Sequence, residues 1–243
     1  MKNPLVKMLM PLTLLTLSGV SCAFANSIVL TQDAYSYGQG GEFNAVTSQN
    51  FLAGYAPSTT ISGGFETFCI ETTVEFTPGT IYSYTLGSSD ATAPGIPLTE
   101  GAAYLYYEFA KGVLTGYDYT DTAGRLADAG LLQAALWYLQ GGQVYNADGS
   151  LHNNPTTDGN PFYALALSMF DSGATNANNG TYGVEVLQMW GANGTPAQNQ
   201  LVLTPVPDNS MTAMLLGIGL VGMYLVQQKL RKSDQVLVHN KKK

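Results

Sequence analysis

The sequence predicts an α+β fold, a β-sandwich or barrel with a helical insertion, between a cleaved N-terminal signal peptide and a C-terminal transmembrane helix. Three observations predict this arrangement. Short apolar runs punctuated by glycine open and close the body of the chain, which is typical of strands. The middle of the body has apolar residues at helical spacing. Uncharged apolar runs lie near both ends of the chain.

Strands are expected wherever short runs rich in β-branched and aromatic residues are bounded by turn residues. Four such runs come first and two return after the helical part, at residues 27–32, 42–47, 65–76, 80–86, 182–190 and 200–204. The order strands, helices, strands favours an α+β domain with inserted helices.

Three helices are expected in the middle of the body. The first follows Thr99, and the second begins with Asp121 or Thr122 as a possible cap and ends at a Gly-Gly pair. The third follows Asn160, whose side chain can cap the helix, and Pro161 suits its first turn.

Residues 1–25 are predicted to be a signal peptide. Lys2 and Lys7 precede an apolar run over residues 9–20, and small residues stand at the cleavage positions before Asn26. Cleavage there removes Cys22 and leaves Cys69 as the only cysteine of the exported chain, so an intramolecular disulfide is excluded.

The other end begins with Val206, Pro207 and Asp208, continues through an uncharged run at residues 211–226 and closes with a basic cluster. This three-part segment, residues 205–232, resembles the C-terminal sorting signal of PEP-CTERM proteins in its Val-Pro-Asp variant; residues 233–243 form an additional basic tail. The resemblance implies processing by an exosortase-type enzyme in bacteria that build extracellular polysaccharide. A permanent membrane anchor is the alternative, with its basic side in the cytoplasm.

The body, residues 26–204, is long enough for a single domain with one sizeable core. It has 15 acidic residues against two basic ones, Lys111 and Arg125, a net charge of −13. Such a charge repels nucleic acid and anionic membranes, so nucleic acid is excluded as a partner. Low charge density with many small polar residues and tyrosines indicates an extracellular β-rich domain.

Cys69 lies in the predicted strand at residues 65–76, on the face that also carries Glu71. The other face, with Phe68 and Ile70, is more apolar and is expected to face the core. The second helix has an apolar stripe with Gln133 on its shoulder and Trp137 one turn later. Gln133 is therefore placed to touch a neighbouring sheet.

These residues resemble the thioester domains of bacterial surface adhesins, which pair an aromatic-Cys-aliphatic-acidic strand motif with a later Gln-x-Ala-aliphatic-Trp helix motif. The motifs here are Phe68-Cys69-Ile70-Glu71 and Gln133-Ala134-Ala135-Leu136-Trp137. The resemblance implies a thioester in which Cys69 is the nucleophile and Gln133 supplies the carbonyl, with Trp137 of the helix motif as a supporting residue. Glu71 projects from the same strand face as Cys69 and is a candidate to orient a water or an amine. An amine or hydroxyl on a target surface would then be acylated. An inert core thiol beside an ordinary amide is the alternative.

Other sites have less support in the sequence. The body has one histidine, His152, which is insufficient for a Ser-His-Asp set or a zinc site, and we expect no enzyme activity, metal or cofactor. Asp148 and Asp158 leave open a loose surface calcium site. The sequence thus predicts an exported surface or matrix protein, whose partners are a surface ligand or extracellular polysaccharide. The alternative is a structural or carbohydrate-associated biofilm protein without a reactive bond.

Overall fold

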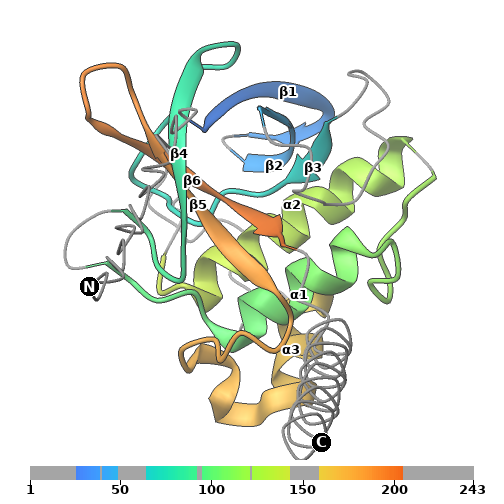
Figure 1. Ribbon diagram of the computed structural model, residues 1–243. Coiled ribbons are helices and arrows are strands. Elements are labelled where there is room, and N and C mark those ends of the chain that lie inside the picture. The colour runs from blue at the N-terminus through green and yellow to red at the C-terminus, as the bar shows by residue number, and fades with distance from the viewer. Residues whose placement is uncertain are drawn as a thin grey trace, which may run out of the picture.

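The computed structural model describes residues 26–38, 40–48, 64–91, 95–120, 122–142 and 159–204 (Figure 1). The predicted signal peptide, the Val-Pro-Asp motif and the C-terminal helix lie outside these residues, as do Asp148, His152 and Asp158. Within the described part of the chain, no helix has the length and apolar character needed to span a membrane.

Six antiparallel strands of the described residues form one curled sheet, a half-barrel. Their bounds are β1 Ser27–Tyr37, β2 Gly40–Thr47, β3 Phe65–Thr67, β4 Ile81–Gly87, β5 Val184–Trp190 and β6 Pro196–Leu203. The order across the sheet is β3-β2-β1-β4-β5-β6. The segment after β3 crosses to the far edge, where the Ile70 N–H donates to the Asn199 carbonyl at 3.2 Å and the Leu201 N–H to the Phe68 carbonyl at 3.0 Å.

In the described part of the chain three α-helices are inserted between β4 and β5, so the predicted α+β class and element order are confirmed. They are α1 Glu100–Ala110, α2 Thr122–Leu139 and α3 Pro161–Phe170, followed by the short 3₁₀ helix η1 Asp171–Thr175. Figure 1 shows α1 and α2 on one side of the strands, and α2 contacts β1 and β2. The Asn160 side chain caps α3, as predicted, and the Thr99 side chain caps α1, which begins directly after it as expected.

Among the described residues, the two larger apolar clusters lie on opposite faces of the sheet, because side chains alternate along each strand. On β5, Val186 faces the helices, while Leu187 faces a core to which all six strands contribute. The helix-side core also contains Leu132 and Leu136 of α2, which belong to the predicted apolar stripe. This packing fixes α2 against the sheet.

The predicted strand at residues 65–76 is too long. Only Phe65–Thr67 is a strand, followed by an isolated bridge between Cys69 and Gln200. The chain leaves β2 after Thr67 and crosses to β6, so no single neighbour could support regular pairing along the whole stretch. Thr122 is also within α2 rather than before it.

Candidate functional site

Cys69 lies where the segment after β3 meets β6. Its side chain is completely buried and belongs to a small cluster with Phe43 of β2 and Trp137 of α2. Helix α2 therefore covers the Cys69 side chain. Phe68 and Ile70, on either side of Cys69, point into the helix-side core.

Gln133 of α2 meets Cys69 through two hydrogen bonds. The Cys69 thiol donates to Gln133 Oε1 at 3.3 Å, and Gln133 Nε2 donates to the Cys69 carbonyl at 2.7 Å. Gln133 is only 2% exposed. The two residues are 64 positions apart in the sequence, and the structure brings them together.

Gly40, at the start of β2, lets the sheet approach this pair closely. A Cβ atom there would be 2.5 Å from Gln133 Cγ and 2.8 Å from Trp137 Cη2, distances that real Cβ atoms essentially never show. A side chain at position 40 would therefore displace the amide of Gln133. Sequence reasoning missed this residue; the only signal was its place in a glycine-rich turn.

The environment of Cys69 favours the neutral thiol. Burial raises the pKa of the thiol well above its ordinary value, because a thiolate would lose its hydration, while the Trp137 side chain acts in the opposite direction. The charge of Glu71 raises the pKa further. A free thiolate is thus strongly disfavoured, and any attack by the sulfur must transfer its proton at the same time.

Glu71 is directed toward the backbone of β6. Its Oε2 accepts a hydrogen bond from the Asn199 N–H at 2.8 Å, and the Glu71 carbonyl accepts one from Gln198 Nε2 at 2.9 Å. These bonds hold the Cys69 segment against β6. A role for Glu71 in orienting water or an amine remains a prediction.

A buried ion pair anchors the N-terminal half of α2, about two turns before Gln133. Arg125 Nε and Nη2 donate to the two carboxylate oxygens of Glu42 on β2 at 2.8 and 2.6 Å. Tyr117 also donates to Glu42, and the guanidinium lies 4.2 Å from the centre of the Tyr35 ring. Because a bidentate pair fixes both position and orientation, it sets the register of α2 over the sheet. The sequence identified Arg125 only as a rare cation.

Glu66 introduces a second buried carboxyl group into the same region. Burial, together with the nearby charges of Glu42 and Asp33, raises its pKa from 4.5 to about 9. Glu66 therefore carries a proton at neutral pH. Strand alternation places Glu66 on the same face as Phe68 and Ile70, the predicted core side, but nothing in the sequence predicts its raised pKa.

Within the described residues, no group of three or more His, Cys, Asp or Glu side chains is arranged to hold a metal ion. The site instead places a thiol beside a carboxamide in the buried interior of the protein. No family model, curated protein or solved structure matches this chain.

Proposed function

We propose that the protein is an exported, non-enzymatic surface or matrix protein that attaches covalently to a target through an internal thioester between Cys69 and Gln133. The observation that carries the proposal is the buried, reciprocal pair of hydrogen bonds between these two residues. An inert cysteine in an apolar core needs no carboxamide oxygen beside its thiol, so the observed pair favours the thioester over the inert alternative.

The bond would form by attack of Cys69 Sγ on the Gln133 carboxamide carbon. The C–N bond breaks, the S–C bond forms, and the thiol proton leaves with the amide nitrogen as ammonia. The hydrogen bond from the thiol to Gln133 Oε1 supports this step, since it gives the proton a path that avoids a free thiolate. The amide is thereby also polarised toward attack.

Burial would preserve the product until a nucleophile arrives. Cys69 is 0% and Gln133 2% exposed, so water is largely excluded from the acyl group. An amine or hydroxyl of the target would attack the same carbonyl carbon, form an amide or ester, and return the proton to the Cys69 sulfur. The target is a surface ligand or extracellular polysaccharide.

The wider assignments form part of the same proposal. The half-barrel with its inserted helices would be the thioester-domain-like body, residues 26–204, with the fold of a barrel or sandwich. Residues 1–25 would direct export through the inner membrane. The motif at Val206, Pro207 and Asp208 would recruit an exosortase-type enzyme, so that the C-terminal helix is a transient or permanent membrane anchor at the cell surface.

Intact-protein mass spectrometry of the exported protein, with and without methylamine, tests the reaction. We expect a mass one ammonia below that of the sequence, and addition of one methylamine at Gln133. Gln133→Ala and Cys69→Ala should each abolish both mass changes. An unmodified mass together with a Cys69 thiol that is alkylated after unfolding, in wild type as in Gln133→Ala, would refute the thioester.

A further inference from the structure

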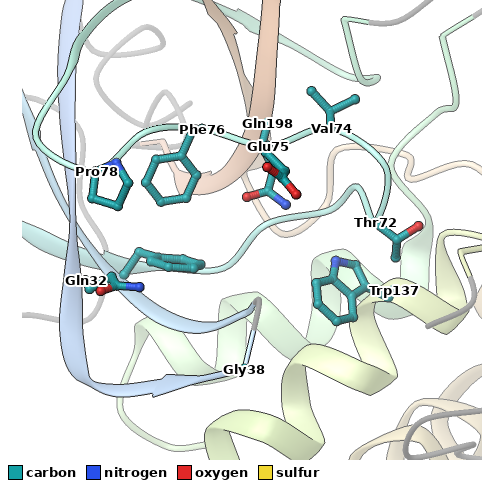
Figure 2. Close-up of a pocket in the computed structure, with 10 residues that line it drawn as sticks. Gln32, Gly38, Thr72, Val74, Glu75, Phe76, Pro78, Trp137 and Gln198 are labelled. Atoms are coloured by element: carbon teal, nitrogen blue, oxygen red, sulfur yellow. The ribbon is translucent and has the colours of Figure 1, made fainter. Parts of the chain in front are cut away.

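A pocket of about 240 Å³ opens beside the buried Cys69 pair. It is lined by β1, β2, the segment that follows Cys69, α2 and β6, through Gln32, Gly38, Phe43, Thr72, Val74, Glu75, Phe76, Pro78, Trp137 and Gln198. Figure 2 shows Glu75 and Gln198 above Trp137, with Phe76 and Pro78 farther along. We call it the Trp137 pocket.

The walls of the pocket are partly aromatic. The rings of Phe43 and Phe76 pack edge to face with centroids 5.0 Å apart, and Trp137 forms the wall on the α2 side. Flat aromatic surfaces bind the apolar faces of ring-shaped ligands. Phe43 and Trp137 also contact Cys69, so one layer of side chains separates the pocket from the thiol.

Apart from Gly38, Val74 and Pro78, the remaining lining is polar and includes one carboxylate but no cation. Gln32, Thr72 and Gln198 offer amide and hydroxyl groups, and the exposed Glu75 contributes a negative charge. Gln198 uses its Nε2 to bond the Glu71 carbonyl, which holds the carboxamide in place. Glu75 disfavours anionic ligands. A ligand with hydroxyls can bond the amide and hydroxyl groups of the lining, and a positive charge on it can pair with Glu75.

The size limits the ligand to one unit of a polymer. The volume is below the roughly 300–1,000 Å³ of pockets that enclose drug-sized molecules. A single pyranose ring fills such a space, presents an apolar face to the rings and directs its hydroxyls toward the amides. The net charge of −13 on the body would attract a cationic polymer.

From these features we propose that the Trp137 pocket binds one hexosamine unit with a free, protonated amino group, as found in a de-N-acetylated polysaccharide. The ring lies against Phe76 and Trp137, and the ammonium group pairs with Glu75. Binding does not require the thioester, since Cys69 does not line the pocket.

The binding test uses the exported protein carrying Cys69→Ala, which prevents covalent capture, and Trp190→Phe, which leaves Trp137 as the only tryptophan. Titration with a glucosamine oligosaccharide should change the fluorescence of Trp137. An N-acetylglucosamine oligosaccharide of equal length and an Nα-acetyl-lysine amide should bind more weakly. Glucosamine binding should weaken as salt rises.

Glu75→Gln should lower the affinity for the glucosamine oligosaccharide by about fivefold, as for a solvent-accessible ion pair, without affecting the N-acetylated one. Glu108→Gln, on α1 outside the pocket, is the matched control and should leave both affinities unchanged. Any one of five results would overturn the proposal. Three concern affinity: no binding of the glucosamine oligosaccharide, equal affinity for the N-acetylated oligosaccharide, or equal or tighter binding of the Nα-acetyl-lysine amide. The other two are an unaltered Trp137 fluorescence signal and an unchanged glucosamine affinity in the Glu75→Gln variant. Loss of ammonia is measured separately, in the protein that retains Cys69. A failure of sugar binding can therefore be distinguished from a failure of thioester formation.

Discussion

Replacing Gly40 with alanine should separate the two partners of the proposed thioester. The backbone of Gly40 lies outside the left-handed region, so the added methyl group acts through space alone. It would be 2.5 Å from Gln133 Cγ and 3.1 Å from Gln133 Cδ. Because Gln133 is buried, it can retreat only by moving away from Cys69 or by shifting α2. Overpacking of this kind costs about 1–3 kcal/mol of unfolding free energy.

Two measurements test this reasoning. Urea denaturation gives the loss of stability, and the intact mass gives the fraction of protein that has lost ammonia. We expect Gly40→Ala to lower both. Gly173→Ala is the matched control, since a Cβ there has its nearest neighbour at an ordinary 3.4 Å. Wild-type stability of the Gly40→Ala protein would contradict the close contact between position 40 of β2 and the Gln133 side chain.

Two further predictions concern the buried charges. Between pH 4.5 and 9 only the folded state keeps the Glu66 proton, so stability should fall as pH rises through this window, by at most about 1.4 kcal/mol per pH unit. Glu66→Gln should flatten this dependence in urea denaturation and be the more stable protein at pH 8. An unchanged pH profile would contradict the assignment. Arg125→Met should cost about 3–5 kcal/mol of unfolding free energy because Glu42 is left buried without its cation. Adding Glu42→Met should restore much of that loss, and equal stability of wild type and Arg125→Met would show that the pair does not anchor α2.

Elements with strong local signals were predictable from the sequence. Thr99 and Asn160 cap their helices because a side-chain oxygen next to the first turn can accept from its free N–H groups, and no distant contact is needed. The strand predicted at residues 65–76 was too long, although the residues alternate as in a strand. The neighbour of this stretch changes from β2 to β6 after Thr67, which interrupts regular pairing. Pairing partners of strands are not encoded locally.

The sequence by itself determined the α+β order of elements and the two short motifs that hold Cys69 and Gln133, since both follow from residue type and spacing. Only the tertiary structure decided that these side chains meet, that Gly40 makes room for them, and that Glu66 holds a proton. Distance, free space and desolvation arise when segments far apart in the chain pack together. The same packing of β1, β2, α2 and β6 creates the Trp137 pocket, which no single segment of the sequence indicates.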